Sequence, residues 1–260
     1  MQWKLESQRD AYARALVELG RERKDVVVLN ADLSTSVKTS VFAREFPERH
    51  FNMGIAEANM IGVSAGLAGS GKIVFASTFA VFGTGRVYDQ IRQSIAYPRL
   101  NVKIVASHAG ITVGGDGATH QINEDIAIMR GLPNMTIVVP ADASETYKAI
   151  RASVLHEGPM YIRLGRADVP VITSPDDPFE IGKATVLKDG DDLTLVGTGI
   201  MVSKCLQAAE ELVKLADASP ENFEYPLNAA VCYEKLGDSL SAARLYVRAA
   251  SLPGATARVR

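Results

Sequence analysis

Solid runs of apolar, mostly β-branched residues alternate with helix-like segments along the first 164 residues of the chain. The pattern predicts strands at 25–30, 50–53, 73–77, 102–107, 135–140 and 160–164. It predicts helices between them at 7–22, 39–46, 56–69, 84–96, 123–130 and 143–156. A strand that is apolar on both faces must be covered on both faces. The chain is therefore predicted to fold as an α/β protein, a parallel sheet with helices on both faces.

Composition and charge narrow the class of protein. Hydrophobic residues make up 47% of the chain and charged residues 22%, as in globular proteins, and the formal net charge is −2. This balance gives no reason to expect nucleic acid or an anionic membrane as a partner. The polar N-terminus lacks a signal core, and Cys205 and Cys232 form neither metal spacing nor a disulfide framework. We expect a cytoplasmic protein with no metal site of its own.

Polar and aromatic segments follow four of the predicted strands. They are ADLSTS (31–36), STFAVF (77–82), SHAGITVGGDGATHQ (107–121) and RLGR (163–166). Active sites of parallel sheets lie beyond the carboxyl ends of the strands. We therefore expect these segments to converge on one edge of the sheet.

Glu57 stands at the start of the predicted helix 56–69, after the extended FNMG. Its neighbours are small and apolar, so the helix should enter the fold where water is scarce. Burial raises the pKa of a carboxyl group, which can then hold a proton near neutral pH. Most first-turn glutamates merely face the helix dipole in solvent. The segments expected to lie beside Glu57 favour a functional role.

The loop 107–121 carries His108, Asp116 and His120 among glycines that let the backbone approach a ligand closely. Gly115-Asp116-Gly117 invites a metal interpretation, but further oxygen ligands at useful spacing are missing. The loop is therefore predicted to bind a ligand without a metal.

Aromatic and cationic side chains complete the candidate site. Phe79 and Phe82, three residues apart, would usually be core residues, yet a flat ring beside Glu57 would need such a pair. A guanidinium group matches the geometry of phosphate. The candidate anion-binding residues are Arg9, Arg163 and Arg166.

The chain changes character after residue 166. Residues 167–182, rich in proline and acids, are predicted to be a linker, and residues 183–218 a truncated α/β unit with a hairpin at 183–199 and a helix to about 216. Residues 219–260 read as two short helices and resemble one tetratricopeptide repeat. This gives a main domain over 1–166 followed by a linker, a truncated unit and a small helical hairpin.

Four segments together resemble the pyrimidine-binding domain of transketolase, in particular the separate C-terminal subunit of split transketolases. They are FNMGIAEANM, STFAVFGTGRVYDQIRQSIAYP, SHAGITVGGDGATHQINEDIAIMRGLPNMTIVVPAD and GPMYIRLGR. The resemblance runs from about residue 5 to 216. It implies a thiamin diphosphate enzyme of carbohydrate metabolism, in the pentose phosphate pathway, that moves a two-carbon ketol unit between sugar phosphates.

The resemblance assigns roles to individual positions. The residues matched to the cofactor's aminopyrimidine end are Glu57, Phe79, Phe82 and Asp32. Those matched to the substrate phosphate are His108, Ser36, Arg9 and Arg166, and those matched to the sugar hydroxyls are Asp116 and His120. The residues expected to take part in catalysis are Glu57, His108 and His120.

Two departures from the family pattern qualify the resemblance. The family's diphosphate and magnesium domain is absent from these residues, so an N-terminal partner subunit is expected to supply it, magnesium ligands included. The family's C-terminal domain begins normally and then gives way to the repeat-like segment. The chain is therefore expected to hold half an active site, to be inactive alone, and to work in a homodimer or heterotetramer.

Three alternatives stay open on the sequence. One is a deoxyxylulose-phosphate synthase, which places Asp-Arg-Ala-Gly where this chain has Ser107-His108-Ala109-Gly110. Another is the β subunit of a 2-oxoacid dehydrogenase. The third is a non-catalytic scaffold, which would have no need of Glu57, His108 and His120.

Overall fold

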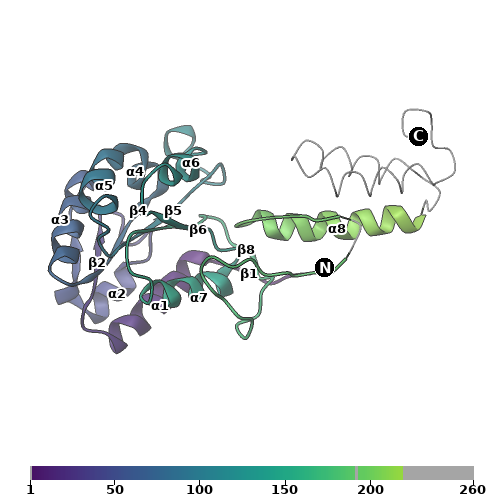
Figure 1. The fold of residues 1–260 in the computed structure, drawn as a ribbon, viewed down its shortest axis with the longest axis horizontal. Coiled ribbons are helices and arrows are strands. Elements are labelled where there is room, and N and C mark those ends of the chain that lie inside the picture. Colours follow the sequence, from purple (N-terminus) through teal and green to yellow (C-terminus); the bar gives the residue numbers. More distant parts are fainter. Residues whose placement is uncertain (1, 191–192, 219–260) are drawn as a thin grey trace. The chain divides into compact units, whose positions relative to one another are not determined.

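The computed structural model describes residues 2–190 and 193–218 (Figure 1). These form two compact units. The first holds residues 2–183 with 198–200, and the second holds the described residues of 184–197 and those from 201 onward. The expected tetratricopeptide-like segment, 219–260, lies outside the described residues.

A six-stranded parallel sheet forms the centre of the first unit. Its strands lie in the order β3-β2-β4-β5-β7-β6. They are β2 (Val26–Asn30), β3 (His50–Asn52), β4 (Ile73–Phe79), β5 (Val102–Ser107), β6 (Thr136–Val138) and β7 (Met160–Arg163). The register pairs Asn30 with Ser77 and Phe79 with Ser107. The carboxyl ends of the central strands therefore meet along one edge.

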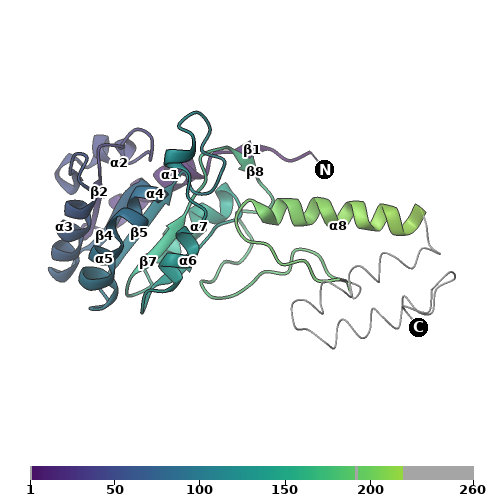
Figure 2. The ribbon, with the colours of Figure 1, turned by 90° about the horizontal axis from the view of Figure 1, so that it is seen from above.

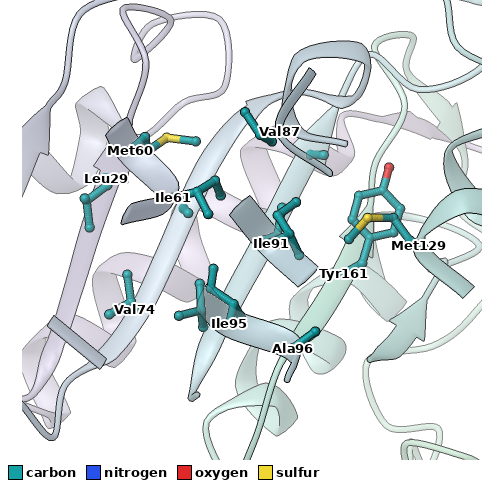
Figure 3. Close-up of a cluster of buried hydrophobic side chains, with 14 of the residues drawn as sticks. Leu29, Met60, Ile61, Val74, Val87, Ile91, Ile95, Ala96, Met129 and Tyr161 are labelled. Atoms are coloured by element: carbon teal, nitrogen blue, oxygen red, sulfur yellow. The ribbon is translucent and has the colours of Figure 1, made fainter. Parts of the chain in front are cut away.

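Helices cover both faces of the sheet (Figure 2). On one face lie α1 (Gln8–Glu22), α2 (Ser40–Glu45) and α7 (Ala143–Ser153), whose apolar side chains form a core with Phe75. On the other lie α3 (Glu57–Gly69), α5 (Tyr88–Ile91) and α6 (Asp125–Arg130), whose apolar side chains share a second core with Val74 and Ala76. In Figure 3, Met129 of α6 lies beside Tyr161 of β7. Alternate residues of β4 thus enter opposite cores. The predicted α/β fold is confirmed.

The predicted helix 84–96 is wrong as one continuous helix. Within that range the chain forms three consecutive pieces of different helix type, η2 (Gly85–Val87), α5 and the π-helical turn η3 (Arg92–Ala96), and a separate short helix, α4 (Ala80–Gly83), precedes them. Glycines at 83 and 85 lower helix propensity on both sides of Thr84, whose hydroxyl donates to the Ala80 carbonyl at 2.6 Å. The break at Thr84 separates α4 from η2, which carries Arg86.

The segment predicted to be a linker is tied to the first unit. Two residues of it, β8 (Val169–Pro170), pair antiparallel with β1 (Leu5–Glu6). The buried Asp142 carboxylate accepts hydrogen bonds from the N–H groups of Ile172 and Thr173, both at 2.7 Å. The domain boundaries drawn from the sequence stay predictions, but residues 169–173 are anchored rather than free.

The second unit contains α8 (Met201–Ala218), where a helix was expected. The hairpin predicted over 183–199 is wrong, since the described residues of that range contain no strand. Val186 and Val196 are 74% and 87% exposed. An isolated two-stranded hairpin is marginally stable in water unless its apolar face packs on something, and these side chains are not packed.

Candidate active site

The carboxyl edge of the sheet gathers side chains from segments far apart in the sequence. Phe79 ends β4, His108 follows β5, and Arg166 comes soon after β7. Glu57 opens α3, which follows β3. The expected convergence of these segments follows from the parallel register, which places Phe79 opposite Ser107 and Ala106 opposite Arg163.

Four aromatic rings pack together at this edge. Phe79 stacks on the His108 imidazole with 3.7 Å between centroids and 23° between planes. Phe82 lies nearly parallel to Phe79 at 6.0 Å. The His120 ring meets Phe82 edge-on at 5.3 Å. The structure thus joins four of the predicted site residues in one cluster, and their individual roles stay predictions.

Glu57 is linked to this ring cluster by Arg86. The Glu57 side chain is only 5% exposed, and its Oε1 accepts a hydrogen bond from Arg86 Nη1 at 3.0 Å. The Arg86 guanidinium carbon lies 4.2 Å from the Phe82 ring centroid, within the range of a cation–π contact. Sequence reasoning missed Arg86. Its position four residues after Phe82, within a motif already singled out, was the available signal.

His108 is buried in an unusual backbone conformation. Its φ is 62°, in the left-handed region, and its Nδ1 lies 2.9 Å from the Ser107 hydroxyl oxygen. Burial lowers the pKa of His108 to about 4, with further lowering from the positive charges of Arg9 and Arg166. The imidazole is therefore neutral near pH 7. When Ser107 donates to Nδ1, Nε2 keeps its proton and can donate to a ligand.

Arg9 and Arg166 gather beside His108. Arg9 donates to the carbonyl of Ser36 at 2.9 Å and to that of Arg166 at 3.0 Å. Burial lowers the pKa of Arg9, and its buried Nε has no hydrogen-bond partner among the described residues. A Cβ at Gly114 would lie 2.9 Å from Arg166 Nη1. The glycine-rich loop can approach the Arg166 guanidinium this closely because residue 114 has no side chain.

The remaining predicted residues are less closely joined. Asp116 is exposed, and His120 Nδ1 lies 2.9 Å from the Thr119 hydroxyl oxygen. Asp32 lies on the loop after β2 with φ 58°, and its N–H donates to Asn52 Oδ1 at 2.9 Å. Within the described residues no interaction joins Asp32 to the ring cluster. Asp32 therefore lies at the carboxyl edge of the sheet, as expected from the sequence. No contact there assigns it a role.

The buried carboxylate of Asp125 accepts hydrogen bonds from two side chains of β7. Asp125 is fully buried, and its Oδ2 accepts from the Tyr161 hydroxyl and from Arg163 Nε, both at 2.7 Å. Burial, together with the negative charge of Asp125, raises the pKa of Tyr161 well above its ordinary value. Arg163 was a candidate anion-binding residue, but its charge is already balanced by Asp125. Sequence reasoning missed this pairing, which joins residues 38 positions apart.

Metal-ligand clusters and membrane-spanning helices were not found in the described part of the chain. No three His, Cys, Asp or Glu side chains there could together hold a metal ion. No described helix is both long enough and apolar enough to cross a membrane. The fold and the site define an α/β ligand-binding domain whose site lies beyond the carboxyl ends of a parallel sheet.

The chain belongs to the transketolase family. Residues 6–171 match the pyrimidine binding domain of transketolase, and residues 182–218 match the transketolase C-terminal domain. A putative transketolase C-terminal section from Methanocaldococcus jannaschii is 51% identical over 82% of this chain and 71% of its own length. A 6-deoxy-6-sulfo-D-fructose transketolase subunit from a Clostridium species is 45% identical over 78% of this chain and 63% of its own.

A solved structure agrees with this assignment. It is a split-gene transketolase described as an inactive beta4 tetramer, with 57% identity and a TM-score of 0.74 over 81% of this chain and 68% of its own. The family and the fold class expected from the sequence are confirmed. Transketolase domains imply dependence on thiamin diphosphate in general.

The free energy of unfolding is expected to fall as the pH drops from about 6.5 towards 4, in part through His108. The ordinary pKa of 6.5 is lowered to about 4 in the folded chain. The unfolded chain therefore binds more protons within that window, so stability present above pH 6.5 is lost as the pH falls through it. The loss from this residue is about 3 kcal/mol at most.

The His108→Asn variant isolates this contribution, because asparagine tolerates a positive φ and does not titrate. Urea unfolding of both proteins between pH 4 and 7.5 should show a shallower pH dependence for the variant. The pKa values of His50 and His156 are also lowered, and they affect both proteins alike. Equal pH dependence in the two proteins would contradict the assignment.

Proposed function

We propose that this chain supplies the pyrimidine-binding half of a thiamin diphosphate-dependent transketolase that transfers a two-carbon ketol unit between sugar phosphates. One observation carries the proposal. A planar, hydrogen-bond-donating group, the Arg86 guanidinium, already bridges the buried Glu57 carboxylate and the Phe82 ring. An aminopyrimidine ring is also flat and also donates from nitrogen. The acid and the aromatic side chains therefore fit the pyrimidine end of this cofactor.

Each residue of the cluster has a role in this proposal. Thiamin diphosphate, when bound, supplies the electron sink for breaking and forming the carbon–carbon bond. Glu57 holds and moves a proton at a ring nitrogen, in a place from which water is largely excluded. Phe79 and Phe82 hold the ring in one plane by stacking. Asp32 stays a proposed cofactor contact on the strength of the resemblance.

The cationic corner is proposed to hold the terminal anion of the sugar. Arg9 and Arg166 supply the positive charge, while the neutral His108 donates a hydrogen bond and Ser36 lies beside Arg9. Asp116 and His120 contact the sugar hydroxyls in this proposal. The Clostridium relative is named for a sulfonated sugar. Sulfonate and phosphate are both oxyanions, and for this chain we propose phosphate, as in the pentose phosphate pathway.

The diphosphate and magnesium are assigned to an N-terminal partner subunit in a homodimeric or heterotetrameric assembly. The names of the relatives, a C-terminal section and a subunit, support this assignment. The split-gene neighbour that is described as an inactive beta4 tetramer supports inactivity of the chain alone.

The test is ketol transfer by the purified chain with and without an N-terminal partner subunit, in thiamin diphosphate and magnesium. Turnover is expected only from the mixture. The Arg166→Gln variant should raise KM for a ketose phosphate about tenfold or more, since hydrogen bonds to charged groups contribute about 1.5–3 kcal/mol, and leave KM for the unphosphorylated ketose unchanged. Arg92→Gln, which removes an exposed arginine outside the site, is the control.

Two outcomes would contradict the proposal. Full turnover by the chain alone would remove the partner from the mechanism. An assembled complex that transfers no ketol unit would favour the scaffold, or, if it acts on pyruvate or another 2-oxoacid, the synthase-like or dehydrogenase-like alternative. Equal effects of Arg166→Gln on both ketoses would disprove the anion assignment alone.

A further inference from the structure

We infer that Arg86 is an internal ligand of the pyrimidine site, which a cofactor ring must displace, and that Arg86 thereby sets the affinity for the cofactor. The inference rests on the proposed function. Arg86 has no role of its own in the proposed function, where its contacts show only what the site can hold. The two contacts that carry it are the hydrogen bond to Glu57 and the cation–π contact with Phe82.

The contacts of Arg86 are those that an aminopyrimidine ring would need. A guanidinium group is planar, donates hydrogen bonds in its own plane and stacks on aromatic rings. Arg86 uses these properties at once, donating to Glu57 at 3.0 Å and lying 4.2 Å from the centroid of Phe82. A ring that bonds to Glu57 and stacks on Phe82 would need the same atoms. Arg86 and the ring therefore compete.

The burial of the two partners shows which of them can leave. The Glu57 side chain is 5% exposed and that of Arg86 is 49% exposed. Arg86 belongs to the short turn η2, whose first residue is the exposed Gly85. The half-exposed Arg86 side chain can move into water, where its charge is hydrated, whereas the buried carboxylate stays in place. Binding is then an exchange of one hydrogen-bond donor for another, so the buried Glu57 carboxyl group keeps a hydrogen-bond partner.

The size of the effect follows from the two contacts that the ring must break. An ion pair with one exposed partner and a single cation–π contact are each weak in water. Together they correspond to about a tenfold change in the dissociation constant. This change is large enough to measure and small enough for the cofactor to overcome.

The experiment measures the dissociation constant of thiamin diphosphate by calorimetry, in magnesium, for the full chain assembled with its N-terminal partner. Arg86→Met keeps the apolar stem but removes the planar donor. Arg92→Met, an exposed arginine six positions along, is the matched control. We expect binding about tenfold tighter for Arg86→Met and unchanged for Arg92→Met. Weaker or unchanged binding by Arg86→Met would overturn the inference, because Arg86 would then support Glu57 or play no part.

A second readout follows Arg86 itself, through its Nη–Hη signals in arginine NMR, because Nη1 is the donor to Glu57; the signals are assigned by their loss in Arg86→Met. We expect a slowly exchanging signal in the wild-type chain that is released by Glu57→Gln and by thiamin diphosphate in the complex. If the cofactor binds and the signal stays held, the internal-ligand inference fails and the proposed function stands. If neither protein binds the cofactor, the proposed function fails and the inference with it.

Discussion

Replacing Glu57 with glutamine is expected to lower kcat of the assembled complex about a thousandfold, because positioned acid–base groups contribute about a hundredfold to ten-thousandfold. An amide can still accept a hydrogen bond but cannot take or give the proton. The KM for the sugar should change little, since Glu57 is proposed to contact the cofactor rather than the substrate. Steady-state kinetics with the partner subunit present would measure both parameters.

Two controls separate chemistry from folding in this experiment. Thermal unfolding should show that Glu57→Gln stays folded, because glutamine has the shape of glutamate. Glu57→Asp keeps the carboxylate but shortens its reach and should recover part of the lost kcat. A kcat close to that of the wild type for Glu57→Gln would remove the residue from the mechanism.

The largest loss of stability is expected from Asp142→Ala, about 4 kcal/mol, since a hydrogen bond to a charged group contributes about 1.5–3 kcal/mol and several are lost together. Asp142 is fully buried. Its carboxylate caps α7 through the N–H of Glu145 at 2.8 Å and accepts from the N–H groups of Ile172 and Thr173. Alanine would leave all three N–H groups without their acceptor. Urea unfolding would measure the difference.

The matched control is Asp176→Ala, which removes an exposed acid from the same stretch of chain and should change stability by less than about 0.5 kcal/mol. Hydrogen exchange adds a local readout. In Asp142→Ala the amides of Ile172 and Thr173 should exchange much faster than in the wild type. If both variants unfold alike and these amides stay protected, residues 169–173 are held by something other than Asp142.

Much of the fold could be predicted because each central strand is apolar on both faces. Val74 and Phe75 enter opposite cores, so only helices on both sides can cover them.

The contacts of Lys103 could not be predicted from such a pattern. This buried lysine in β5 donates to the carbonyls of His156 and Gly158, and burial lowers its pKa to about 7. Its acceptors are more than fifty residues away in the sequence, where no local pattern could find them.

The candidate site could be predicted as far as strand ends determine it. Phe79 and His108 were expected at one edge because both follow parallel strands, and their rings stack at 3.7 Å. Pairing between side chains was beyond prediction. Arg163 was expected to be available for an anion, but in the fold it forms an ion pair with Asp125. Arg86 was passed over because its meaning depends on Glu57, 29 positions earlier.

The left-handed backbone at His108 has a consequence for redesigning this site. A library that places all amino acids at position 108 would vary the backbone energy as well as the chemistry, because φ there is 62°. Asparagine, aspartate and glycine suit this conformation, whereas most other residues cost about 1–2 kcal/mol. Inactive library members with valine or isoleucine would therefore report on folding rather than on the imidazole. Attempts to change substrate preference should start from the first three, or from Arg166, where no such constraint applies.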